Sequence, residues 1–95
     1  MSFHSKFKSE EMDELFEAIL SLENIDECYR LFEDLCTINE LHSICQRLQV
    51  AKMLNQKRTY IEIEKETKAS TATISRVNKS LTYGADGYKL IFERI

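Results

Sequence analysis

The chain contains no proline, and its only two glycines, Gly84 and Gly87, lie within the last dozen residues. Proline and glycine are the residues that interrupt helices most strongly. Almost nothing before Gly84 therefore breaks a helix. We expect an all-α fold of about six helices.

Polar residues that cap helices precede several stretches with apolar residues at helical spacing. Ser9 precedes two acidic residues, Asn24 stands three residues before Glu27, and Thr37 forms a capping box with Glu40. The apolar stripes of these three expected helices comprise Met12, Leu15, Phe16, Ile19 and Leu20; Ile25, Cys28, Phe32 and Leu35; and Leu41, Ile44, Cys45, Leu48 and Ala51. Such wide stripes fit either a monomeric core or burial against a second subunit.

A chain of 95 residues suits one domain, and it buries only roughly 60 to 65 per cent of its unfolded surface. We expect a short flexible arm over residues 1–8 and a single helical domain over residues 9–95. A second subunit would add the buried surface that so small a domain lacks.

Charge is divided unevenly along the chain. Residues 1–46 carry three basic and eleven acidic side chains, whereas residues 47–79 carry eight basic and three acidic ones. Lysine and arginine contacts to phosphate supply most nonspecific DNA affinity. The division predicts an acidic half for oligomerisation and a basic half that faces DNA, although a solvated helix face would explain the charge equally well.

Other classes of protein find little support in the residues. No apolar run approaches the ~20 residues that span a bilayer, so we expect a cytoplasmic protein without membrane contact. The chain has an odd number of cysteines and no C-x-x-C pair among them, namely Cys28, Cys36 and Cys45. This argues against a disulfide framework and against a structural metal site. His4 and His42 have no companion groups for catalysis. We therefore expect no metal, no cofactor and no enzymatic activity.

Two closely spaced helix starts predict a helix-turn-helix over about residues 59–81. Thr59 forms a capping box with Glu62, and Ser70 caps a further helix about eleven residues later. Apolar or small side chains stand where the two helices should pack together, at Ile63, Thr67, Ala69, Ile74 and Val77. Lys68 takes the turn position that usually holds glycine, so we expect a less favoured backbone conformation there.

In a helix-turn-helix the second helix enters the major groove with its N-terminus first. This places Ser70, Thr71, Ala72 and Thr73 at base edges. Four cations would contact phosphates, namely Lys65, Lys68, Arg76 and Lys79. The alternative is an ordinary helical hairpin whose hydroxyl groups only cap the helix.

The segments Leu35-Cys-Thr37 with Glu40, Arg47, Ala72-Thr-Ile-Ser-Arg76 and Ser80-Leu81 resemble the tryptophan repressor family, in particular its YerC/YecD-type branch. The likeness covers roughly residues 31–95. It implies an intertwined all-helical homodimer that binds double-stranded DNA at a palindromic operator, with half-sites about one helical turn apart.

The resemblance also implies an effector pocket. In the members that bind tryptophan, the matching positions line the corepressor site; here they are Thr37, Arg47, Arg76 and Ser80. The family's glycine after the recognition-helix arginine gives the indole ring room, but this chain has Val77, whose isopropyl group would obstruct the ring. We expect an effector other than tryptophan. Salt bridges with Glu40 or binding of phosphates are the alternative roles of the two arginines.

Taken together, these features predict a sequence-specific DNA-binding transcription regulator, and we expect it to act as a repressor. The competing interpretation is a non-enzymatic protein-interaction module, in which the acidic half binds a partner helix and the basic half is incidental.

Overall fold

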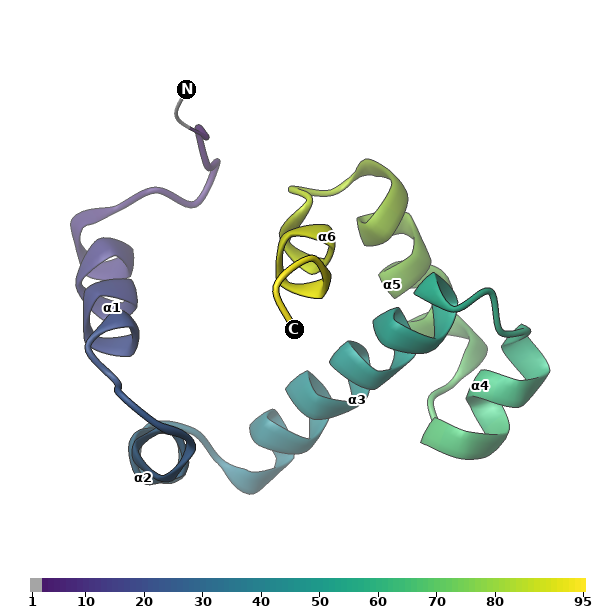
Figure 1. Cartoon of the computed structure of the whole chain (residues 1–95), viewed down its shortest axis with the longest axis horizontal. Coiled ribbons are helices and arrows are strands. Elements are labelled where there is room, and N and C mark those ends of the chain that lie inside the picture. The colour runs from purple at the N-terminus through teal and green to yellow at the C-terminus, as the bar shows by residue number, and fades with distance from the viewer. Residues whose placement is uncertain (1–2) are drawn as a thin grey trace. The chain divides into compact units, whose positions relative to one another are not determined.

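The computed structural model describes residues 3–95, which contain six α-helices and no strand (Figure 1). The helices are α1 (Glu10–Leu20), α2 (Ile25–Leu35), α3 (Ile38–Asn55), α4 (Tyr60–Thr67), α5 (Thr71–Tyr83) and α6 (Gly87–Phe92). The predicted all-α fold is confirmed. The first two residues of the arm expected over residues 1–8 lie outside the described part of the chain.

The chain divides into two compact units, Met1–Thr37 and Ile38–Ile95. The first unit contains α1 and α2, and the second contains α3 to α6. The single domain expected over residues 9–95 stays a prediction.

The two helices of the first unit begin at the expected caps. The Ser9 hydroxyl accepts a hydrogen bond from the Met12 N–H at 3.0 Å, and the Asn24 side-chain oxygen accepts one from the Glu27 N–H at 2.9 Å. Such caps satisfy backbone donors that a helix leaves free at its start. Both caps were predicted from the sequence, and both are confirmed.

Neither helix of the first unit contains a buried residue. The most exposed large apolar side chains of the pair are Phe16, Leu20, Ile25, Tyr29 and Leu35, and Leu20 is 83% exposed. Two adjacent amphipathic helices thus present apolar side chains that remain uncovered. A surface of this kind usually marks an interaction site.

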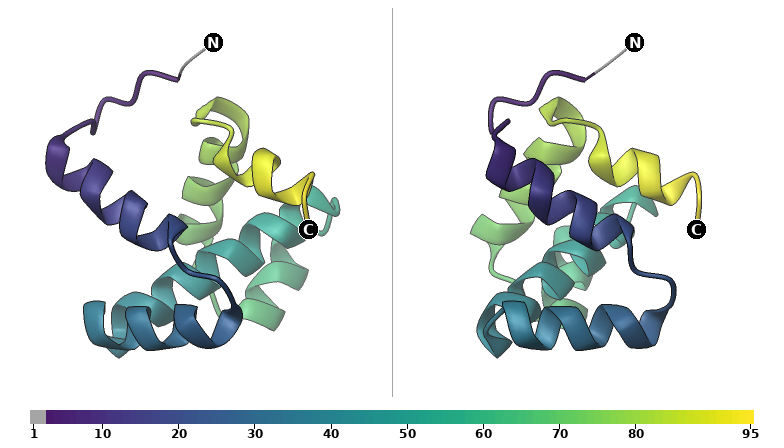
Figure 2. Two further views of the ribbon diagram at one scale, coloured as in Figure 1. Left: turned by 60° about the vertical axis from the view of Figure 1, so that its left-hand side comes forward. Right: turned by 90° about the vertical axis from the view of Figure 1, so that its left-hand side faces the viewer.

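The second unit is built around α3, which contacts α4, α5 and α6 (Figures 1 and 2). Its core contains Val50, Ala51, Met53, Ile63, Ala69, Ile74 and Val77, with Leu54, Leu81, Tyr88 and Phe92 packed against them. The buried residues of α3 all lie in its C-terminal half. The apolar side expected along the whole of α3 is therefore only partly covered, and Ile44 is 46% exposed.

Candidate nucleic-acid interface

The helix α4 begins at the predicted capping box. The Glu62 N–H donates to the Thr59 hydroxyl at 3.2 Å, and the Thr59 N–H donates to the Glu62 carboxylate at 3.1 Å. These reciprocal bonds satisfy two backbone donors and fix the start of the helix.

The turn between α4 and α5 is closed by short-range hydrogen bonds. The Thr67 hydroxyl donates to the Ile63 carbonyl at 2.7 Å and accepts from the Ala69 N–H at 3.2 Å. Lys68 adopts the left-handed conformation, with φ 64° and ψ 12°. The less favoured backbone expected at this non-glycine residue is confirmed.

A contact from α3 holds the same turn in place. The Gln46 side-chain amide donates to the Thr67 carbonyl at 3.0 Å, across 21 residues of the sequence. A helix leaves its last carbonyls without partners inside the helix, and this bond satisfies one of them. The turn is therefore connected to the central helix of the unit by a polar contact as well as by the core.

The two helices pack through the side chains that the sequence indicated. Ile63, Ala69, Ile74 and Val77 are buried, whereas Thr67 is half-buried. With α3 contacting both helices and α4 contacting α5, the arrangement of two short helices around a three-residue turn is a helix-turn-helix.

The start of α5 exposes some of the predicted base-reading residues more than others. Thr71 and Ala72 are exposed, while Thr73 is half-buried. The Ser70 hydroxyl accepts from the Thr73 N–H and donates to the Thr73 hydroxyl, both at 3.2 Å. Ser70 is exposed as well, but its hydroxyl group is occupied as a helix cap. Thr71 and Ala72 are therefore the exposed residues of the four whose side chains have no capping role.

The four predicted phosphate-binding cations are all exposed. Lys65 lies on α4, Lys68 in the turn, and Arg76 and Lys79 on α5. Ala72, Arg76 and Lys79 recur at the spacing that places side chains on one face of a helix. None of the four cations forms an ion pair within residues 3–95. Their charges are therefore available to an anionic ligand.

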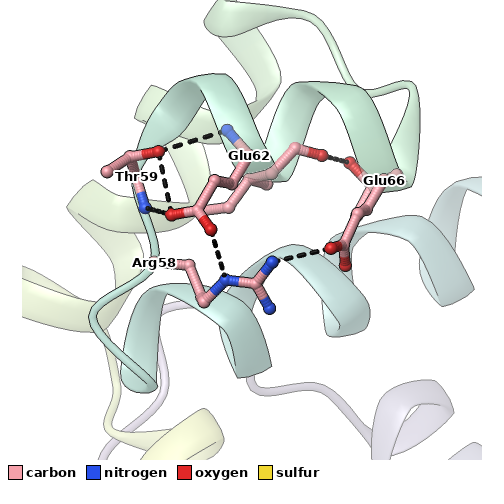
Figure 3. Close-up of polar contacts among 6 residues, drawn as sticks. Arg58, Thr59, Glu62 and Glu66 are labelled. Atoms are coloured by element: carbon pink, nitrogen blue, oxygen red, sulfur yellow. Dashed lines mark hydrogen bonds and ion pairs between the residues drawn. The ribbon is translucent and has the colours of Figure 1, made fainter.

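Arg58 has a different role from these cations (Figure 3). Its Nε donates to Glu62 at 3.1 Å, and its Nη2 donates to Glu66 at 2.6 Å. The two carboxylates raise the pKa of Arg58 through hydrogen bonds and charge. Hydrogen bonds from the backbone and side chain of Thr59 and from Arg58 lower the pKa of Glu62. One arginine thus compensates two of the three acidic side chains of α4.

The sequence reasoning did not single out Arg58, although its i,i+4 spacing to Glu62 is a recognisable ion-pair pattern. It also missed Glu64, which lines a hollow of about 560 Å³ with Lys68, Ala69, Ser70 and Thr71. No pattern in the sequence places Glu64 beside the start of α5, because that neighbourhood depends on the turn.

The predicted effector residues are distributed over both units. Thr37 is the last residue of the first unit and is exposed. Arg47 lines a shallow hollow of about 400 Å³ that is formed by α3 alone. Arg76 and Ser80 lie one helical turn apart on α5, and both are exposed. Neither arginine forms an ion pair in the described part of the chain.

The remaining features bear on other kinds of site. Cys28, Cys36 and Cys45 are free thiols. Residues 3–95 contain no group of three or more histidine, cysteine, aspartate or glutamate side chains that could hold a metal ion. None of the helices in this range is long and apolar enough to cross a lipid bilayer.

These features define a class of protein, the helix-turn-helix regulators, and sequence comparison identifies the family. The profile of the Trp repressor protein family matches residues 10–95. The chain therefore belongs to the Trp repressor family, which is a family of non-enzymatic DNA-binding regulators.

Individual relatives agree with this assignment. The chain is 56% identical over 90 residues to the uncharacterized protein YerC of Bacillus subtilis (strain 168), covering 95% of this chain and 86% of YerC. A crystal structure of a candidate Trp repressor from Staphylococcus aureus matches with a TM-score of 0.90 and 58% identity, over 94% of this chain and 89% of that one. A TrpR-like protein from Eubacterium eligens ATCC 27750 matches with a TM-score of 0.91 and 60% identity, over 94% and 92% of the two chains.

Proposed function

We propose that this protein is a sequence-specific transcription regulator, a repressor, that binds a palindromic operator as a homodimer through α4 and α5. The observation that carries the proposal is the set of unpaired cations on the helix-turn-helix, Lys65, Lys68, Arg76 and Lys79. Cations without internal partners can replace the counterions of DNA phosphates at no cost in broken ion pairs.

The expected roles divide between positioning and base reading. The four cations bind phosphates and fix the register of the protein on the duplex. Thr71 and Ala72 are exposed at the start of α5, where a hydroxyl group can hydrogen-bond a base and a methyl group can contact thymine. Thr73 takes part from a half-buried position, and Ser70 caps the helix that carries them.

The uncovered apolar side chains of α1 and α2 support the homodimer. Neither helix buries a residue, and the apolar residues on their stripes would be costly to leave in water. A second copy of the chain would cover them and also bring a second α5 into place. The two recognition helices would then lie about one turn of the DNA double helix apart and read the two halves of a symmetric operator.

An effector remains part of the proposal. The exposed polar side chains available to it include Arg47, Arg76 and Ser80. Neither arginine forms an ion pair within residues 3–95. A guanidinium binds carboxylate or phosphate groups well, so we propose an anionic small molecule. Val77 is only 1% exposed and is part of the core, so making room there for an indole ring would require repacking. We therefore propose an effector other than tryptophan. We also propose a cytoplasmic location for the regulator.

Selection of binding sites from random duplex DNA tests the proposal directly. The purified protein is used with and without a pool of amino acids and related metabolites, with tryptophan alone as a separate arm. Enrichment of a two-fold symmetric site would support a dimeric operator-binding regulator, and dependence on one metabolite would identify the effector.

A complete failure to enrich any site would contradict the proposal and favour the protein-interaction module. The salt dependence of binding to one duplex separates these two functions as well. A phosphate-binding surface loses DNA affinity steeply as the salt concentration rises. A surface that binds a partner helix predicts no such salt-dependent binding to the duplex.

A further inference from the structure

The three glutamates of α4 have unequal structural roles. Glu62 forms the capping box and binds Arg58, and Glu66 binds the same guanidinium. The Glu64 carboxylate, by contrast, has no hydrogen bond and no ion pair within residues 3–95. The fold therefore gives Glu64 no evident stabilising task.

Glu64 lies in the hollow between α4 and the start of α5. This hollow of about 560 Å³ is lined by Glu64 and Lys68 from α4 and its turn, and by Ala69, Ser70 and Thr71 at the beginning of α5. The exposed residues of this end of α5 are the ones proposed to read bases. The carboxylate of Glu64 therefore shares one surface depression with the recognition end of the helix-turn-helix.

An unpaired carboxylate on this surface has a marked chemical preference. It is repelled by phosphates, which Lys65 and Lys68 beside it would bind. In the major groove it can accept a hydrogen bond only from the amino groups of cytosine and adenine. The adenine amino group lies beside N7, an acceptor that repels a carboxylate, whereas the cytosine amino group has no acceptor next to it on the same base.

We propose that Glu64 is a specificity-determining residue that accepts a hydrogen bond from the N4 amino group of a cytosine in each half-site. This inference rests on the proposed function, because it requires α5 to enter the major groove. It predicts a G·C base pair at one fixed position in each half-site of the operator. It also assigns base reading to α4, in addition to the recognition helix.

The test is site selection and competition binding with the full-length protein and two variants, Glu64→Gln and Glu64→Ala. The wild-type protein should enrich cytosine at one position in each half-site and bind that site roughly 5- to 100-fold more tightly than a site with thymine there. Both variants should lose this preference and retain the preferences at other positions. Circular dichroism and thermal melting establish that both are folded, which is expected because Glu64 is exposed.

Glu93→Gln is the matched control, because it removes the same charge from an exposed glutamate that forms no ion pair in the described residues and lies at the end of α6. It should leave the cytosine preference intact. A uniform rise in affinity for all sequences in Glu64→Gln, with unchanged preferences, would overturn the role of Glu64 and leave the regulator proposal standing. If the wild-type protein enriches no symmetric site, both proposals are overturned.

Discussion

Arg58 donates a hydrogen bond from Nη2 to Oε1 of Glu66 at 2.6 Å, across eight residues of the chain. Because its Nε also binds Glu62, one planar guanidinium holds two consecutive turns of α4 against the connection from α3. The first helix of the helix-turn-helix is therefore positioned by a polar contact on the surface as well as by Ile63 in the core.

Replacing Arg58 tests this positioning. Arg58→Ala should lower the urea midpoint of unfolding slightly, as expected for exposed ion pairs, and should weaken DNA binding because two acidic side chains lose their compensating charge. Arg58→Lys retains the charge but lacks the planar fork. We expect it to recover the DNA affinity and only part of the stability. Equal urea midpoints in all three proteins would show that the contact does not position α4.

The left-handed conformation at Lys68 predicts a stabilising substitution. Lys68→Gly should raise the free energy of unfolding by about 0.5–1 kcal/mol, because glycine avoids the steric cost of a side chain at φ 64° although it adds entropy to the unfolded chain. Lys57 has the same φ of 64° in the turn before α4. Lys57→Gly is therefore the matched control and should stabilise similarly in urea titrations, whereas only Lys68→Gly should weaken DNA binding.

Glu62 predicts a pH dependence of stability with a definite sign. Its pKa is lowered in the folded protein, first by the hydrogen bonds from Thr59 and then by Arg58. A lowered folded-state pKa contributes stability at pH values above the ordinary glutamate pKa of about 4.3, and this contribution is lost as the pH falls through the folded-state pKa. Glu62→Gln retains a side chain that can take part in the capping box. It should reduce the slope of the unfolding free energy against pH between about pH 5 and 3.

Urea titrations at a series of pH values and one protein concentration measure this slope. Glu64→Gln removes the same charge from an unpaired position on α4 and serves as the control. It should leave the contribution of Glu62 in place. A wild-type slope in Glu62→Gln would contradict the role assigned to the capping box and ion pair.

The unpaired cations of α5 predict a change in the salt dependence of DNA binding. Arg76→Ala and Lys79→Ala should weaken binding and reduce the slope of log affinity against log salt by about one unit for each phosphate that the variant no longer neutralises. Fluorescence anisotropy with one labelled duplex at several salt concentrations measures both quantities. Arg94→Ala, in the last residues of the chain, should change neither. Unchanged affinity in both α5 variants would remove these residues from the interface.

The uncovered apolar stripe of α1 predicts a variant that would weaken the proposed homodimer. Phe16→Glu should raise the dimer dissociation constant about 10- to 100-fold, because a buried aromatic side chain contributes roughly 1.5–3 kcal/mol. Sedimentation equilibrium measures the change. Ala18→Glu places the same charge on the same helix away from the apolar stripe and should dissociate much less. A Phe16→Glu protein that remains as dimeric as the wild type would exclude this stripe from the interface.

Local patterns were sufficient to predict four helix caps and much of the helix-turn-helix. Ser9, Asn24, Thr59 and Ser70 were expected as caps, and each accepts a hydrogen bond from the backbone three residues later. The buried positions Ile63, Ile74 and Val77 also followed from spacing. The left-handed turn at Lys68 followed from the usual place of glycine in such turns. These features depend on residues within one or two helical turns of each other, so the sequence contains the information directly.

Interactions between distant residues were decided only by tertiary structure. The bond from Gln46 to the Thr67 carbonyl and the ion pair of Arg58 with Glu66 depend on the angle at which α4 leaves α3. The hollow that joins Glu64 to Thr71 depends on the turn between α4 and α5. Periodicity identifies which face of a helix is apolar, but the neighbours that cover it are set by packing. The sequence by itself therefore determined the helices, their caps and the family. Only the tertiary structure decided which half of α3 is buried, and only it separated the ion-paired Arg58 from the unpaired cations.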